Sequence, residues 1–168
     1  MSRRASILSI ALTLCSTLAL PVISIAQPGL NESLNELARD LDRVESLRAV
    51  KSLQSHYAQY AQYGLWNEVG ALFAADGSFV FDGLIKPAQT VKGPVAIATF
   101  LRTRYGGGHE GLSKDSVSSM MIDAPVINLS VDGESAKARW QAILFHGHGG
   151  QARVEGGVFE NDYARERG

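Results

Sequence analysis

Cysteine is almost absent from this chain, which has only Cys15 among its 168 residues. One cysteine cannot form an internal disulfide, and Cys15 lies in an apolar run near the start, so neither disulfides nor thiol chemistry are expected in the rest of the chain. Basic blocks, internal repeats and low-complexity linkers are also missing. Lys and Arg number 16 against 17 Asp and Glu, a formal net charge of −1. We therefore expect neither nucleic acid nor an anionic membrane as a partner.

Residues 1–26 have the parts of an export signal: Arg3 and Arg4, an apolar run from Ile7 to Leu20, and small residues in Ser24-Ile25-Ala26. We expect cleavage after Ala26 and an exported protein, periplasmic or extracellular. A membrane anchor is the alternative, but the run is short for a span and is interrupted by serine and threonine. Cleavage leaves roughly 140 residues, enough for one domain. It removes two arginines and no acid, so the net charge falls to −3, and no membrane segment remains.

The stretch from Pro125 to His148 predicts a β-hairpin. Apolar and polar residues alternate from Ile127 to Val131 and again from Ala136 to Leu144. This period of two lets a strand bury one face. Asp132-Gly133 lies between the arms and favours a tight turn. Two strands alone are not stable, so we expect further strands and a covering helix.

Two helical patterns precede the hairpin. The first has leucines and a valine in steps of four and three, and it breaks at Arg48; its members are Leu30, Leu34, Leu37, Leu41 and Val44. We predict a short helix docked on its own domain, with a dimer-forming coiled coil as the alternative. The second runs from Val44 to Gly64 and predicts the main helix over the sheet. Residues 27–43 are thus assigned to a helical extension and residues 44–168 to the domain.

Shorter patterns complete the fold. Trp66–Phe73 and Val95–Tyr105 predict helices, and Ser78–Phe81, Val117–Ile122 and Gly157–Ala164 predict strands. Helices come first and antiparallel strands follow, which indicates an α+β domain with helices on one face of a curved sheet.

Several of these segments together resemble the SnoaL-like group of the nuclear transport factor 2-like superfamily, which includes polyketide cyclases, scytalone dehydratase and ketosteroid isomerases. The resemblance runs from about Val44 onward through residues 57–63, Trp66, 72–77, Gly93, Ile97, Phe100, 125–127, Asp132-Gly133, Ala136, Arg139-Trp140 and 157–163. It implies a cone of curved antiparallel sheet closed by helices, with an internal pocket, and a homodimer formed through the outer sheet face. The chain ends where relatives continue into a final strand, so we expect an open sheet edge.

The resemblance also implies chemistry at tyrosines and histidines. Tyr63 matches the tyrosine near the end of the main helix, and His146 or His148 matches a histidine on a strand. The aspartate expected after the tyrosine is replaced by Gly64, and a second histidine falls at Met120 or Met121. These departures weaken the prediction of dehydratase chemistry.

The residues themselves point to a pocket under the main helix. His56, Tyr60 and Tyr63 form one stripe of that helix, and Leu53, Tyr57 and Tyr60 form an adjoining one. Either stripe can place phenol hydroxyls over an apolar floor, where a small aromatic molecule can bind. The alternative is that the tyrosines are core residues and His56 lies on the surface.

Other candidates lie on strands and loops. His146 and His148 are two apart on a strand and face the same way as Trp140, but without a third ligand they predict no metal site. Asp76 is a candidate base or only a turn residue. The GGGHEG stretch at residues 106–111 follows a helix, which argues against dinucleotide binding; His109 is a candidate in a lid loop, and a plain flexible loop is the alternative.

We therefore predict an exported, cofactor-free lyase or isomerase for a small cyclic or aromatic carbonyl compound. The predicted catalytic residues are Tyr63, His146, His148 and Asp76, and the predicted ligand-binding residues are His56, Tyr57, Tyr60, Trp66, Trp140 and His109. A non-catalytic binding protein for a small hydrophobic molecule or a protein partner on the same fold is the second hypothesis.

Overall fold

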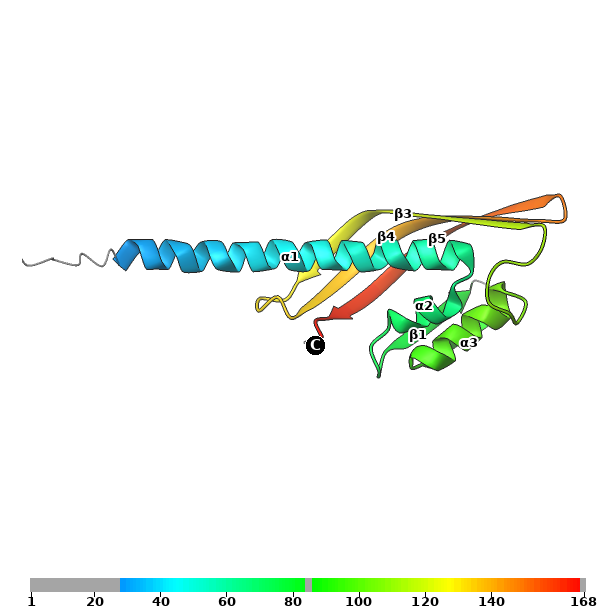
Figure 1. The fold of residues 1–168 in the computed structure, drawn as a ribbon, viewed down its shortest axis with the longest axis horizontal. Helices are drawn as coiled ribbons and strands as arrows, with labels where there is room; N and C mark the ends of the chain where they lie inside the picture. Colours follow the sequence, from blue (N-terminus) through cyan, green and yellow to red (C-terminus); the bar gives the residue numbers. More distant parts are fainter. Residues whose placement is uncertain (1–27, 84–85, 167–168) are drawn as a thin grey trace, which may run out of the picture.

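The computed structural model describes residues 28–83 and 86–166. The predicted export signal, residues 1–26, lies outside this range. The elements follow in the order α1 (Pro28–Tyr63), α2 (Trp66–Ala71), β1 (Ser78–Gly83), β2 (Lys86–Lys92), α3 (Pro94–Tyr105), β3 (Ser116–Leu129), β4 (Ser135–His148) and β5 (Gln151–Ala164) (Figure 1). The predicted α+β class is confirmed. None of the helices described here is long and apolar enough to cross a membrane.

Helix α1 is one continuous helix of 36 residues (Figure 1). Its N-terminal part projects beyond the sheet, and its five apolar residues from Leu30 to Val44 remain between 53% and 64% exposed. The prediction that this part docks on its own domain is therefore wrong. Burial of side chains in α1 begins at Ser46, and the side of the helix that faces the domain from there on is not the side that carries these apolar residues.

The C-terminal half of α1 lies on the inner face of the main sheet. Val50 packs with Ala136, Ala138 and Trp140 of β4 in one hydrophobic core. The alanines are small and let the helix backbone approach the sheet closely, while the tryptophan fills the remaining space. The helix ends at Gly64, whose φ of 70° is readily adopted by glycine.

The main sheet has the antiparallel order β3-β4-β5. The predicted hairpin is present, but the segment predicted as a separate strand at Val117–Ile122 is continuous with its first arm in β3. The register shifts between Asp123 and Val126, and Ala124 has a φ of 51°. β4 and β5 are joined by Gly149-Gly150, both with positive φ, as a tight hairpin turn requires.

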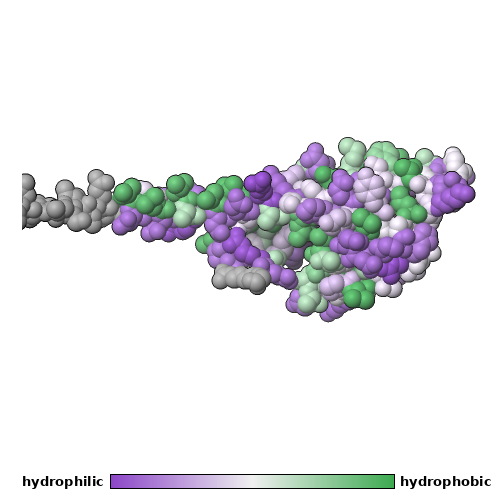
Figure 2. Space-filling model, in the orientation of Figure 1, coloured by the Kyte–Doolittle hydropathy of each residue, from purple (hydrophilic) through white to green (hydrophobic). Residues whose placement is uncertain are grey.

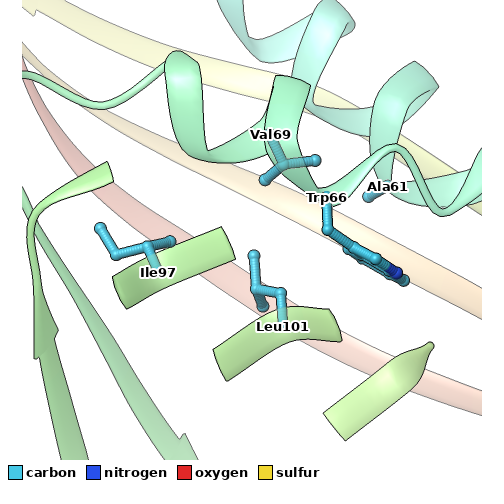
Figure 3. Close-up of a cluster of buried hydrophobic side chains, with 5 residues drawn as sticks. All are labelled: Ala61, Trp66, Val69, Ile97 and Leu101. Carbon is cyan, nitrogen blue, oxygen red and sulfur yellow. The ribbon is translucent and has the colours of Figure 1, made fainter. Parts of the chain in front are cut away.

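A second core joins the short elements. Ala61, Trp66, Val69, Ile97 and Leu101 come from α1, α2 and α3 and are buried against one another (Figure 3). The β1-β2 ribbon borders this core, and its second strand was missed because Pro87 and the polar residues near it give no strand pattern. Among the described residues the sheets β1-β2 and β3-β4-β5 are separate, and neither closes into a barrel.

Candidate functional site

His146 lies on the inner face of β4, opposite Ser118 of β3. Its ring stacks on Tyr105, the last residue of α3, with 6.1 Å between ring centroids and 9° between planes. Its Nδ1 lies 3.5 Å from the Ser118 hydroxyl oxygen. Its Nε2 is buried and has no hydrogen-bond partner among the residues that the structure describes. Because buried polar atoms are nearly always paired, this nitrogen marks a position where a ligand atom can bind.

Tyr57 of α1 brings a desolvated hydroxyl toward the same region. Burial raises the pKa of this phenol well above its ordinary value, and the neighbouring phenol of Tyr105 raises it further. The Tyr57 ring meets the edge of Phe159 at 5.4 Å. We call His146, Tyr105, Ser118 and Tyr57 the His146 cluster; it draws on α1, α3, β3 and β4. Because its pKa is raised, the Tyr57 phenol keeps its proton at neutral pH and can donate a hydrogen bond.

Trp66 also stacks on Tyr105, with 6.1 Å between the ring centroids. Its Nε1 is buried and also lacks a partner among the described residues. A Cβ at Gly106 would lie 2.4 Å from this nitrogen, so only glycine fits there. Tyr105 thus contacts both rings whose nitrogens are unpaired. Sequence reasoning missed Tyr105, although its place at the end of a helix, before the glycine run, was visible.

The other helix and strand candidates are more exposed. His148 is exposed at the end of β4, with its Nδ1 2.8 Å from the Ser116 hydroxyl. His56 is exposed and stacks on Tyr60 at 5.7 Å. Tyr63 is 61% exposed at the end of α1. The His146 cluster therefore includes Tyr57 and His146 but neither His148 nor Tyr63.

The two loop candidates lie at the surface. Asp76 is exposed in the turn before β1. His109 is exposed, and its Nε2 lies 3.4 Å from the Ser113 hydroxyl. The adjacent Glu110 accepts hydrogen bonds from the Asn67 backbone at 2.9 Å and from Arg102 Nε at 3.0 Å. These bonds attach the glycine-rich loop to α2 and α3.

Trp140 belongs to a polar network beneath α1. Its Nε1 donates to the Tyr163 hydroxyl at 3.0 Å, and that hydroxyl donates to Gln54 Oε1 at 2.8 Å. Asn161 Nδ2 donates to both oxygens. Burial raises the pKa of Tyr163. This network fastens α1 to β4 and β5, and no sequence pattern had indicated it.

Two hollows of the described structure lie away from the His146 cluster. One of about 300 Å³ lies between α2 and α3 and is lined by Asn67, Ala71, Pro94, Val95, Ala98, Thr99 and Arg102. One of about 110 Å³ lies between α1 and the β3-β4 turn, beside Val50 and Tyr163. No group of three or more metal-binding side chains occurs among the residues described.

The family model of the SnoaL-like domain matches residues 42–168. Among solved structures, ActVI-ORFA from Streptomyces coelicolor is similar, with 20% identity, a TM-score of 0.55, and coverage of 71% of this chain and 86% of that chain. A putative scytalone dehydratase from Novosphingobium aromaticivorans has 16% identity, a TM-score of 0.59 and coverage of 74% and 77%. A hexachlorocyclohexane dehydrochlorinase, LinA type 2, has 18% identity, a TM-score of 0.60 and coverage of 76% and 80%. No curated protein matches in sequence. At these identities the structural likeness shows a shared fold.

Proposed function

This chain belongs to the SnoaL-like family, and we propose that it is a cofactor-free lyase or isomerase acting on a small cyclic or aromatic carbonyl compound. The observation that carries the proposal is the unpaired, buried Nε2 of His146, whose ring stacks on Tyr105. A neutral imidazole in such a place can accept a proton from the carbon next to a carbonyl group.

The surroundings of His146 fit this role. Stacking on Tyr105 and the contact with Ser118 hold the ring in one orientation, so Nε2 points at a fixed place. The Tyr57 phenol, whose raised pKa keeps it protonated, can donate a hydrogen bond to the carbonyl oxygen as negative charge develops there. The proton then returns at another atom in an isomerisation, or a leaving group departs in an elimination. Either reaction balances without a cofactor.

The names of structural neighbours support the reaction class. One is called a dehydratase and another a dehydrochlorinase, and both names denote eliminations. A Catenulispora acidiphila protein of this fold was solved with the small molecule S-DNPA. The same proton-abstraction step begins many eliminations and isomerisations of carbonyl compounds.

A binding protein without catalysis is the second candidate. It is favoured by the position of the two hollows, neither of which is lined by the His146 cluster. On this hypothesis the ligand would bind beside α2 and α3 or under α1, and His146 would have no effect on it.

The test is proton exchange with solvent. The purified protein is incubated in deuterated buffer with a panel of cyclic and aromatic ketones, and loss of the α-hydrogen is followed by NMR. We expect exchange on at least one compound, reduced about 100-fold or more in His146→Gln, since a general base contributes about that much. The matched control is His148→Gln, on the same side of the same strand but exposed, which should retain exchange. Absence of exchange by the wild type, or equal exchange in His146→Gln, contradicts the enzyme proposal. Ligand-induced heat stabilisation that persists in His146→Gln supports the binding protein.

We further propose export through residues 1–26 and a homodimer through the outer sheet face. Exposed apolar residues gather on that face in β3, β4 and β5, namely Val117, Met121, Ile143, Phe145, Val154 and Val158. Mass spectrometry of the exported protein should find Gln27 at its N-terminus; retention of residues 1–26 contradicts the export proposal.

A further inference from the structure

The projecting part of α1 carries an apolar seam that the described structure leaves uncovered. The seam consists of Leu30, Leu34, Leu37, Leu41 and Val44, each more than half exposed. Figure 2 shows hydrophobic residues along one side of this projecting helix and hydrophilic residues along the other. Exposing leucine side chains to water is energetically unfavourable, so a row of them indicates a surface that a partner covers.

The seam has the width and period of a coiled coil. Its steps of four and three average 3.5 residues, and the positions flanking it are small or polar: Asn31, Ser33, Ala38, Asp40 and Glu45. A helix that docks on a globular surface shows a broader apolar stripe. The row ends at Arg48, close to where the helix begins to bury other residues in its own domain.

The seam faces away from the sheet that α1 covers. At 100° per residue, the buried residues Ser46, Val50 and Gln54 lie roughly 150° around the helix from the seam. Closing the seam onto the same chain's sheet would expose Val50 and Gln54. A second molecule can reach the seam without disturbing the domain.

The charges on this helix indicate what kind of partner covers the seam and in which orientation a second helix would lie. Acidic residues outnumber Arg39 and Arg43 on the polar sides of this helix, which disfavours an anionic lipid surface; they are Glu32, Glu36, Asp40, Asp42 and Glu45. In a parallel pair, Asp40 would face Glu45 of the second copy, a repulsive contact. An antiparallel pair with Leu34 opposite Leu37 places Asp40 near Ser33 instead and stacks Leu30 against Leu41.

We propose that this seam pairs with the seam of a second copy of the chain in antiparallel orientation. The pair would be reversible, because two heptads are fewer than an independent coiled coil usually needs. It would be distinct from a dimer through the outer sheet face, since the seam belongs to α1, which packs on the inner face of the sheet. It does not depend on the proposed enzymatic function.

The first test is molecular mass by sedimentation over a range of concentrations. We expect Leu34→Glu combined with Leu41→Glu to halve the mass of the assembly at high concentration. The control is Arg39→Glu, which changes the net charge equally on the polar side of the same helix and should keep the wild-type mass. Met121→Glu tests the outer sheet face separately. A wild-type mass in the double variant, or a monomeric wild type at every concentration, overturns the proposal.

The second test determines direction by disulfide cross-linking in a Cys15→Ser background. Leu30→Cys chains mixed with Leu41→Cys chains should cross-link with each other. Leu30→Cys alone should not, because the two residues 30 would be about 16 Å apart along the antiparallel pair. Efficient cross-linking of Leu30→Cys with itself would show a parallel pair and contradict the proposed orientation.

Discussion

The two halves of α1 have the same local structure and opposite surroundings. The N-terminal half exposes four leucines and a valine, while the C-terminal half buries Ser46 and Gln54. Hydrophobicity alone would assign these environments the other way round. Which side chains of this helix are buried is therefore decided by where the sheet lies and not by how apolar they are.

The buried oxygens of Gln54 and Ser46 in the C-terminal half are paired with specific atoms, whereas Gln54 Nε2 has no partner among the described residues. Gln54 Oε1 accepts bonds from Asn161 and Tyr163, and Ser46 donates to the Asp42 carbonyl oxygen at 2.9 Å. A paired buried amide costs little, whereas an unpaired one is destabilising. The exposed leucines have no packing partner within the described chain that would offset the cost of their exposure. The same substitution can therefore be compared in a buried half and an exposed half of one helix.

The largest expected difference comes from placing the same charge in each half. Val50→Asp introduces a carboxylate at a position only 8% exposed, beside Trp140 and two alanines, and should reduce the free energy of unfolding by about 3 kcal/mol. Val44→Asp, at a position 58% exposed, should change it by less than about 0.5 kcal/mol when measured on dilute protein. Urea denaturation followed by circular dichroism measures both. Similar losses in the two variants would mean that the N-terminal half is also packed.

A smaller difference is expected at high pH for the tyrosines of the C-terminal half. The folded state holds the Tyr57 proton to higher pH than the unfolded state, because burial raises its pKa. Above the ordinary tyrosine pKa near 10 the folded state thus binds more protons, and stability falls as pH rises, by up to about 1.4 kcal/mol per pH unit for one group.

Tyr57→Phe should therefore lose less stability than the wild type between about pH 10 and 11 and differ little from it at neutral pH. The control is Tyr63→Phe, because Tyr63 is largely exposed at the end of the same helix. Thermal unfolding at a series of pH values provides the comparison. An alkaline slope unchanged by Tyr57→Phe would show that this phenol is solvated.

The smallest expected effect concerns the buried glutamine. Gln54→Leu removes the acceptor of the Tyr163 hydroxyl and one acceptor of Asn161, but it also removes the unpaired Nε2 of Gln54, so a loss of only about 1 kcal/mol is expected. Gln59→Leu, in an exposed position on the same helix, should lie within about 0.5 kcal/mol of the wild type. Chemical denaturation distinguishes the two. A stabilised Gln54→Leu protein would mean that the network contributes specificity without stability.

Most of the fold was predictable because its patterns are local. The alternation from Ala136 to Leu144 and the Asp132-Gly133 dipeptide predicted β4 and its turn, where Gly133 has a positive φ, and Gly64 marked the end of α1. β2 was missed because its proline and polar residues have no period. The candidate site was only partly predictable, since Tyr105 and His146 are about 40 residues apart in the chain and their rings meet only in the tertiary structure.

The sequence by itself determined the helices, the long hairpin and the apolar seam, since each depends on the spacing of residues within one segment. The tertiary structure alone decided that the seam stays exposed, that Gln54 is buried, and that His146 and Trp66, whose rings both stack on Tyr105, each have an unpaired nitrogen. The reason is physical: periodicity identifies an apolar side of an element, but whether that side is covered depends on the position of a neighbour distant in the chain.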